Sequence, residues 1–278
     1  MATGYGRFQT PEAPSALRQL HLHDGTTPLK AVDHETPVAV LDQSDLLAQG
    51  IHTSRFIPGA RDEDSLGSCT AQAALEALAR KLPLVGFLAV CTQLINHAAS
   101  QAPTSYTTTA GIERAAVAFY YRCTHQTGDP QEEWPPTDCG SSGPYIVQLL
   151  QRMGVIKGQK IAHAGTDLVS LLQADGVLMG SPFFYAWEEP DTHGFIDGNG
   201  HATDLEGAIA SGVAGGHETY IAAIEKITLL PTGRVDAFNT VLRVRNHWRR
   251  SWGDHGCFRV HLSTLAMIAG QCDFRQLV

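Results

Sequence analysis

The feature that most constrains this chain is a cysteine followed directly by a long run of helix-forming residues. Residues 69–82 read Cys-Thr-Ala-Gln-Ala-Ala-Leu-Glu-Ala-Leu-Ala-Arg-Lys-Leu, with no β-branched residue after Thr70. The apolar residues recur along one helical face, and Pro83 ends the helix because proline lacks an N–H. Glu76 and Arg80 stand four residues apart on another face, where they can form an ion pair. The pattern predicts a buried helix that carries a thiol in its first turn.

The start of this predicted helix suits a reactive thiol. Gly67 and Ser68 precede Cys69, and serine is a residue type that caps helices. The unpaired N–H groups and partial positive charge at a helix N-terminus favour a thiolate over a thiol. Cysteine is also among the residue types most often buried. From this stretch alone, Cys69 is therefore either a nucleophile or a small core residue.

Size and charge exclude several classes of protein. The chain has 278 residues, of which 43% are hydrophobic, enough for a substantial core in one large domain or two. Its net charge is −8 with no block of Lys and Arg, so we expect no nucleic-acid partner. The apolar runs are too short to span a membrane. We see no signal peptide and expect a cytoplasmic location, with a virion or non-classical export as alternatives.

Cysteine usage and histidine spacing argue against disulfides and metals. In a chain of this size without a visible export signal, we expect thiols in a reducing compartment. The six cysteines are Cys69, Cys91, Cys123, Cys139, Cys257 and Cys272. Thirteen histidines are present, but no CxxC, HxxxH or HExxH spacing occurs. We therefore predict no metal site and no cofactor.

Helix signals dominate the first half of the chain and strand signals the second. Besides 69–82, helices are predicted at 86–99, 112–122, 144–153 and between Thr166 and Gly176. Strands are predicted at 177–187, 219–230, 237–246 and 256–261, with a Gly-, Asp- and His-rich loop at 188–216. Residues 1–55 are predicted to be an extended N-terminal segment or a propeptide, and residues 56–278 one main domain. This order indicates an α+β fold with two lobes.

The strand-rich half supplies candidates for a base and for a group that orients it. His217 follows two glycines where a loop enters a strand, and Asn246 ends another strand, two residues before Trp248. If these strands are neighbours, Asn246 can accept a hydrogen bond from one ring nitrogen of His217. The other nitrogen would then face Cys69, giving the nucleophile, base and orienting group that thiol catalysis requires.

Three separated motifs in this order resemble the papain-like cysteine peptidases, in the compact form common in bacteria. They are Gly-Ser-Cys-Thr-Ala at 67–71, Gly-His at 216–217, and Asn-His-Trp continuing to Ser-Trp-Gly-Asp-His-Gly at 246–256. The last motif is the most specific, because both tryptophans keep the family's spacing from Asn246. Asp-Cys-Gly-Ser-Ser at 138–142 is similar to the family's substrate-binding segment. The resemblance covers about residues 55–265 and is weakest from 86 to 135.

The resemblance implies a helical left lobe, a β-barrel-like right lobe and an active-site cleft between them. Cys69 would be the nucleophile, His217 the base, and Asn246 the residue that fixes the imidazole. The backbone N–H of Cys69 would donate to the oxyanion. Trp248 would shield the His217–Asn246 hydrogen bond from water. The substrate-binding residues would be Cys139, Gly140, Ser141, Gly216 and Trp248. The implied reaction is hydrolysis of a peptide or protein through an acyl-enzyme intermediate.

One departure from the family affects the expected activity. The family has a Gln six residues before the nucleophile as second oxyanion donor, and this chain has Glu63. An ionised carboxylate only accepts hydrogen bonds, and losing one oxyanion donor costs about 10²–10³ in rate. Glu63 could be protonated, could point away, or could pair with Arg249, which stands where the family usually has Gly. Three alternatives stay open: an active endopeptidase, a papain-like fold with weakened or absent activity in a binding or structural role, and a related thiol acyl transfer.

Overall fold

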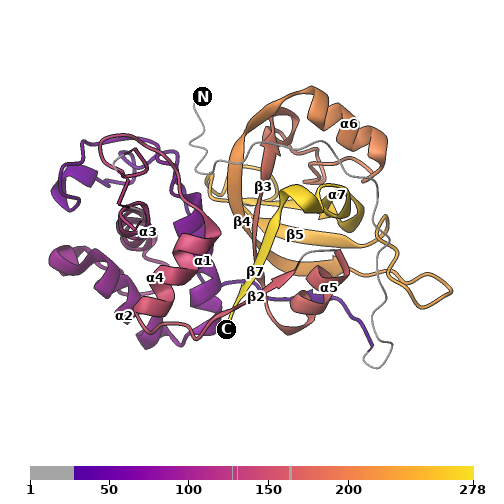
Figure 1. Ribbon diagram of the computed structural model, residues 1–278, viewed down its shortest axis with the longest axis horizontal. Helices are drawn as coiled ribbons and strands as arrows, with labels where there is room; N and C mark the ends of the chain where they lie inside the picture. Colours follow the sequence, from indigo (N-terminus) through magenta and orange to yellow (C-terminus); the bar gives the residue numbers. More distant parts are fainter. Residues whose placement is uncertain (1–27, 127, 130, 163–164) are drawn as a thin grey trace.

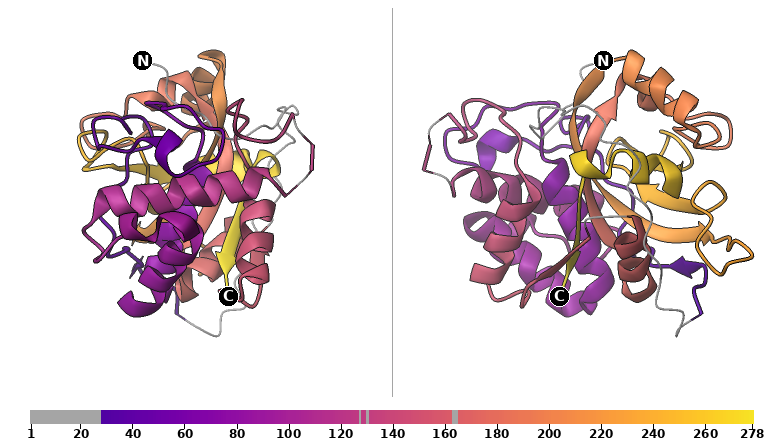
Figure 2. Two further views of the ribbon diagram at one scale, coloured as in Figure 1. Left: turned by 90° about the vertical axis from the view of Figure 1, so that its left-hand side faces the viewer. Right: turned by 45° about the vertical axis from the view of Figure 1, so that its right-hand side comes forward.

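The computed structural model describes residues 28–126, 128–129, 131–162 and 165–278 (Figure 1). Helices from the first half of the chain form one lobe, and an antiparallel sheet with its flanking helices forms the other. The right-hand view of Figure 2 shows the same two lobes side by side, and in the left-hand view the helical lobe lies in front of the sheet lobe. The predicted α+β fold class with a helical lobe and a strand-rich lobe is confirmed.

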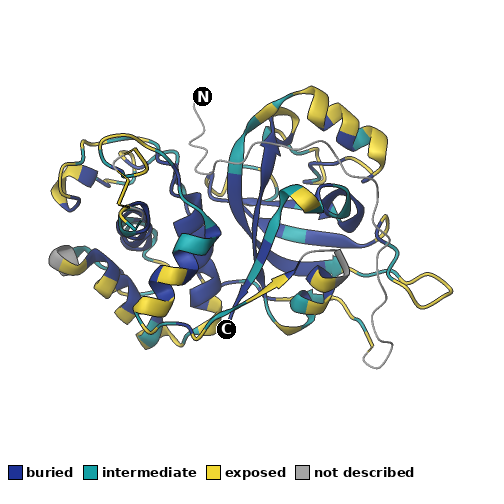
Figure 3. Ribbon diagram, in the orientation of Figure 1, coloured by how far each residue is buried: buried dark blue, intermediate teal, exposed yellow. Residues whose placement is uncertain are grey.

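The helical lobe is built around its first long helix. It contains α1 (Cys69–Lys81), α2 (Leu84–Ile95), α3 (Thr109–Thr124) and α4 (Gly143–Arg152), with the short 3₁₀ helices η1 (Thr53–Arg55) and η2 (Asn96–Gln101). Every residue of α1 from Cys69 to Ala79 is buried, which gives this helix its dark blue colour in Figure 3. Its many alanines let the neighbouring elements approach closely, because helix separation depends on the side chains at the contact. From Cys69 to Ala79, α1 is therefore enclosed on all sides.

The second lobe contains one seven-stranded sheet. Its strands are β1 (Val32–Asp33), β2 (Gln159–Ala162), β3 (Val177–Phe184), β4 (Val213–Lys226), β5 (Val241–Arg245), β6 (Cys257–His261) and β7 (Asp273–Leu277). The order is β2-β7-β3-β4-β5-β6, with β1 paired to β4, and α1 packs against β3 and β4. The sheet is open, with β2 and β6 at its ends among the described residues, so the expectation of a β-barrel-like lobe needs correction: the strands do not close.

Three helices and two 3₁₀ turns complete this lobe. They are α5 (Gly165–Ala174), η3 (Tyr185–Glu188), α6 (Ala202–Ala210), α7 (Leu262–Met267) and η4 (Ala269–Gln271). None of the helices within the described ranges is both long and apolar enough to cross a membrane.

Strand register brings the predicted base and its predicted partner together. In the antiparallel pair of β4 and β5, Tyr220 lies opposite Arg245. Asn246 directly follows Arg245 at the end of β5, and His217 precedes Tyr220 in β4. Because antiparallel neighbours run in opposite directions, Asn246 extends along β4 towards His217. The expectation that these two strands are neighbours is confirmed.

The described part of the N-terminal segment packs against both lobes. His34 N–H donates to the carbonyl of Ala222 in β4 at 2.7 Å, and Leu46 N–H donates to the carbonyl of Asp64 at 2.8 Å. Four apolar side chains of the segment are buried in the core of the helical lobe: Val38, Leu41, Leu46 and Ile51. Residues 1–27 lie outside the described residues, and the boundary between 55 and 56 stays a prediction.

The observed helices and strands differ from the predicted ones at helix ends, in the glycine-rich segment and in the short strands. The predicted helix at 86–99 begins at Leu84 and ends at Ile95. The predicted loop at 188–216 is wrong in part, because it contains α6 and the first residues of β4. Its glycines suggested a loop, yet Gly215 and Gly216 pair with β3. The short strands β1, β2 and β7 were missed, since such strands depend on their neighbours more than on their own residues.

Candidate active site

Cys69 is the first residue of α1, as predicted. Ser68 occupies the N-cap position without a side-chain capping bond, and its Oγ instead accepts from Gln72 Nε2 at 3.0 Å. Across the lobe interface, the Glu218 N–H of β4 donates to Cys69 Sγ at 3.4 Å. The sulfur of Cys69 therefore contacts the strand residue that directly follows His217.

His217 is hydrogen-bonded to Asn246. The Nε2 atom of His217 lies 2.7 Å from Asn246 Oδ1, which also accepts from the His247 backbone N–H at 2.8 Å. An amide oxygen can only accept, so in the neutral ring Nε2 carries the proton. The other ring nitrogen, Nδ1, is then the one able to accept a proton, as a general base must.

Aromatic rings enclose the imidazole. Trp248 stacks on His217 with ring centroids 5.0 Å apart, and Phe183 meets the same ring edge-on at 5.3 Å. Trp248 is 3% exposed, which agrees with the predicted shielding of the hydrogen bond below it. Phe183 was not predicted to lie at the site. Its strand, β3, is mostly apolar, so the sequence does not distinguish Phe183 from the residues of the hydrophobic core.

The three predicted catalytic side chains are fully covered. Cys69, His217 and Asn246 each have an exposed fraction of 0%. Burial lowers the pKa of His217 to about 3, the hydrogen bond with Asn246 opposes this shift, and the nearby charge of His247 adds to it. In this state the imidazole is neutral at pH 7, and a peptide reaches Cys69 only if covering residues move.

The predicted substrate-binding segment is fastened to the turn before the nucleophile. The Tyr120 hydroxyl accepts from the N–H groups of Cys139 and Gly140, at 3.2 and 2.9 Å, and donates to Asp138 Oδ1 at 2.5 Å. Asp138 Oδ2 accepts from the Gly67 N–H at 2.6 Å. No sequence motif pointed to Tyr120, which reaches this segment from α3.

The remaining predicted substrate-binding residues lie on two different elements. Ser141 is half-buried at the end of the same segment, just before α4. Gly216 is half-buried in β4, next to His217 and opposite Pro182 of β3.

Glu63 interacts with a tryptophan and not with Arg249. The indole N–H of Trp134 donates to Glu63 Oε1 at 3.2 Å. Burial raises the pKa of the Glu63 carboxyl, the Trp134 hydrogen bond opposes this, and the Asp138 charge adds to it. Arg249 lies beside Asp42, with 3.9 Å between Nε and Oδ2. Its backbone φ of 65° is the left-handed conformation that favours glycine, which fits the Gly that the resemblance implies there.

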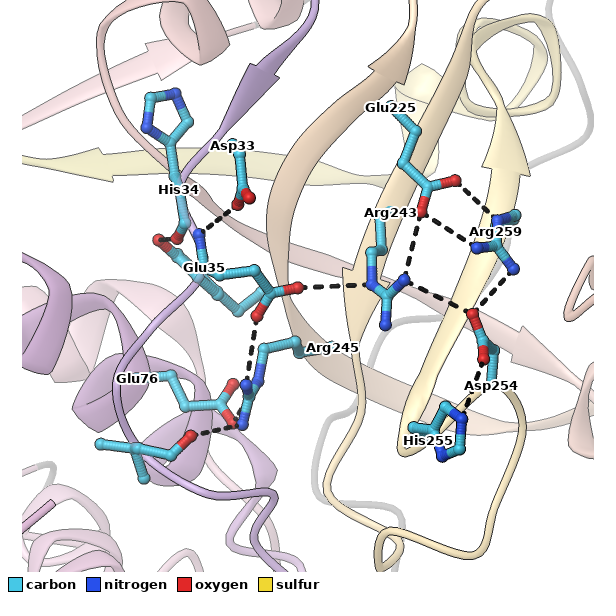
Figure 4. Close-up of polar contacts among 12 residues, drawn as sticks. Asp33, His34, Glu35, Glu76, Glu225, Arg243, Arg245, Asp254, His255 and Arg259 are labelled. Carbon is cyan, nitrogen blue, oxygen red and sulfur yellow. Dashed lines mark hydrogen bonds and ion pairs between the residues drawn. The ribbon is translucent and has the colours of Figure 1, made fainter. Parts of the chain in front are cut away.

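A carboxylate of α1 links the two lobes. Glu76, with an exposed fraction of 0%, accepts from Arg245 Nε at 3.1 Å and contacts His247 Nε2 at 3.0 Å. The predicted Glu76–Arg80 pair is therefore wrong: Arg80 is exposed, whereas Glu76 points into the lobe interface. Figure 4 shows the contacts continuing outward from Arg245 along one face of the sheet, through Glu35, Arg243, Glu225, Arg259 and Asp254.

The described residues give no metal-binding arrangement. Within the described ranges, no three His, Cys, Asp or Glu side chains are grouped as metal ligands. The six cysteines form no disulfide bond with one another.

Comparison with known proteins adds structural neighbours only. No protein-family model matches the chain, and no curated protein matches it either. Among solved structures, it is similar to xylellain, a cysteine protease from Xylella fastidiosa, with 16% identity, 99% of this chain and 96% of that chain covered, and a TM-score of 0.45. It is also similar to procathepsin B from Trypanosoma congolense, with 14% identity, coverages of 99% and 86%, and a TM-score of 0.43.

A further similar structure is the bromelain protease from Ananas comosus, with 13% identity, 91% of this chain and 99% of that chain covered, and a TM-score of 0.36. All three TM-scores lie below 0.5, so the activity of these proteins does not carry over to this chain. What the structure itself establishes is a two-lobed α+β protein in which a helix-tip cysteine contacts the residue that follows a strand histidine, and this histidine is hydrogen-bonded to an asparagine.

Proposed function

We propose that this chain is a thiol-dependent endopeptidase of the papain-like type, with Cys69, His217 and Asn246 as its catalytic residues. Cys69 Sγ attacks the carbonyl carbon of a peptide bond while His217 Nδ1 takes the thiol proton. The tetrahedral intermediate collapses to a thioester, and His217 gives the proton to the leaving amine. Water, deprotonated by His217, then hydrolyses the thioester and restores the thiol.

The observation that carries this proposal is the pair of contacts around β4. Cys69 Sγ accepts from the N–H of Glu218 at 3.4 Å, and the imidazole of the preceding residue, His217, is held by Asn246 at 2.7 Å. The helix tip thus contacts the strand residue next to the proposed base, and that base is bound to the proposed orienting amide. These contacts support nucleophilic catalysis by a thiol, which needs a base beside the sulfur and a group that orients the base.

Oxyanion stabilisation would come from the start of α1. The backbone N–H of Cys69 lies in the first helical turn, where N–H groups have no partner within the helix. Glu63 is the proposed second group, and it would donate only when protonated. Its raised pKa, caused first by burial, favours that form.

Covalent labelling tests the proposal directly. An epoxysuccinyl inhibitor, followed by peptide mapping, is expected to modify Cys69 in the wild-type protein, and Cys69→Ser is expected to lose both the adduct and hydrolysis of a fluorogenic peptide. Because Cys69 is fully covered, labelling should be slow and should quicken under conditions that loosen the lobe interface.

Cys272→Ser is the matched control. Cys272 is a half-buried thiol outside both the proposed triad and the predicted substrate-binding segment, so its removal should leave the Cys69 adduct in place. Adducts only at other cysteines, with Cys69 unmodified, would contradict the proposal.

A second candidate is a papain-like protein with weakened or absent peptidase activity in a binding or structural role. The observation in its favour is Glu63, whose carboxyl replaces the oxyanion Gln. If ionised Glu63 suppresses catalysis, Glu63→Gln should raise kcat by about 10²–10³, the usual value of one oxyanion donor.

The same variant separates the two candidates. If protonated Glu63 already donates, Glu63→Gln should leave kcat nearly unchanged at low pH. A protein that hydrolyses no peptide either as wild type or as Glu63→Gln, yet remains folded, would favour the binding role.

A further inference from the structure

A single buried carboxylate contacts both neighbours of the proposed orienting asparagine. Glu76 Oε1 accepts from Arg245 Nε at 3.1 Å, and Glu76 Oε2 lies 3.0 Å from His247 Nε2. Arg245 and His247 are the residues on either side of Asn246. Asn246, between these two residues, is hydrogen-bonded to His217 and not to Glu76.

Glu76 belongs to the helix of the proposed nucleophile. It lies seven residues after Cys69 in α1, about two helical turns along. The contacts to Arg245 and His247 therefore join the element that carries the thiol to the segment that orients the base. The backbone N–H of His247 completes the connection, because it donates to the same Asn246 Oδ1 that binds His217.

The charge state of Glu76 suits this role. Burial alone would raise the pKa of its carboxyl, but the charges of Arg245 and His247 and their hydrogen bonds more than offset it, so the pKa lies below its ordinary value. The ionised carboxylate offers two oxygens in fixed positions, one for each partner. The Arg245 side chain is held further by a hydrogen bond from Nη2 to the Val38 carbonyl at 2.8 Å.

We propose that Glu76 is a positioning residue of the site: it fixes Asn246 through Arg245 and His247, and thereby sets the orientation of the His217 ring towards Cys69. This role rests on the proposed peptidase function. Glu76 itself touches no substrate; it acts through the segment that follows β5 (Figure 4 shows its contact with Arg245).

The test compares Glu76→Gln with Glu35→Gln in the full chain. Glu35 binds the same Arg245 from the solvent side, at 3.2 Å, with a side chain 34% exposed, so it controls for loss of a carboxylate partner. The readout is hydrogen exchange of the His217 Nε2–H proton by NMR, assigned through its absence in His217→Gln. His34 is the internal reference, because its ring is buried and bonded to the Leu172 carbonyl at 2.6 Å.

In Glu76→Gln, exchange at His217 is expected to quicken at least about 10-fold more than at His34, and kcat to fall by about 10-fold or more with little change in KM. Glu35→Gln should change the exchange rate at His217 and the value of kcat by less than about twofold each. Equal acceleration at His217 and His34, or none at either in a folded variant, would overturn the positioning role. If the wild type hydrolyses no peptide, the proposed function fails while the NMR comparison still decides the role of Glu76.

A second variant covers the case in which Glu76→Gln does not fold. His247→Gln removes one contact and keeps both the Glu76–Arg245 pair and the backbone N–H to Asn246. It is expected to accelerate exchange at His217 selectively, by less than Glu76→Gln would. If His247→Gln folds and has no effect specific to His217, the proposal is wrong.

Discussion

Glu76 at the lobe interface and Glu113 inside the helical lobe are both carboxylates with an exposed fraction of 0%, yet their pKa values move in opposite directions. Glu76 has Arg245 and His247 as partners, and its pKa is lowered although burial alone would raise it. Burial raises the pKa of Glu113 to about 7; hydrogen bonds from Gln72 and the Asp42 N–H oppose the shift, and nearby negative charge adds to it.

The difference shows that burial does not by itself fix the charge of a carboxyl group. A cationic partner in a dry environment outweighs the desolvation cost, whereas neutral donors do not. At the lobe interface, Glu76 therefore stays ionised and its charge joins the two lobes. Inside the helical lobe, the Glu113 carboxyl has a pKa near neutral pH.

The largest effect is expected for Glu76→Gln. It leaves the Arg245 guanidinium, which is 6% exposed, without its buried counter-ion. Removing one partner of a buried ion pair costs about 3–5 kcal/mol. Urea unfolding at pH 7 measures this cost, and Glu113→Gln is the matched variant. If the two substitutions lower the free energy of unfolding equally, burial and not the cationic partner determines the loss of stability. The proposed difference between Glu76 and Glu113 would then be wrong.

An intermediate effect, dependent on pH, is expected for Glu113→Gln. In the folded protein the pKa of Glu113 is about 7, above its ordinary value of 4.5, so the stability that this carboxyl contributes is present below pH 4.5 and is lost as the pH rises through 7. The variant does not titrate, and Gln72 can turn its amide to bind it. Between pH 5 and pH 8, the free energy of unfolding of Glu113→Gln should rise by about 2 kcal/mol relative to that of the wild type.

Urea unfolding at pH 5, 6.5 and 8 measures this trend. A stability difference that stays constant across these three pH values would show that Glu113 does not titrate as its surroundings imply. If the stability of the variant relative to wild type falls as the pH rises, the pKa of Glu113 is lowered in the folded protein and not raised.

The smallest effect is expected for Glu35→Gln. Glu35 pairs with Arg245 and Arg243, at 3.2 and 3.3 Å, but its side chain is 34% exposed. Pairs open to solvent contribute about 0–1 kcal/mol because water and salt screen them. Unfolding in low and high salt measures the cost. A loss as large as that of Glu76→Gln would mean that exposure matters less than the shared partner, Arg245.

Sequence reasoning found the site residues more readily than their surroundings. The helix at α1 and the segments around His217 and Asn246 were visible because helical periodicity and short motifs are local properties. Phe183 and Tyr120 were missed, since each acts through a neighbour far away in sequence. The short strands that complete the sheet were missed for the same reason.

The sequence alone determined that a cysteine begins an apolar-faced helix, that helices precede strands, and that a histidine and an asparagine follow the cysteine in the strand-rich half. Only the tertiary structure decided that Glu76 pairs with Arg245, 169 residues away, and that Cys69 is covered. The physical reason is that ion pairing and burial depend on distances and dielectric surroundings in three dimensions, and spacing along the chain does not specify these.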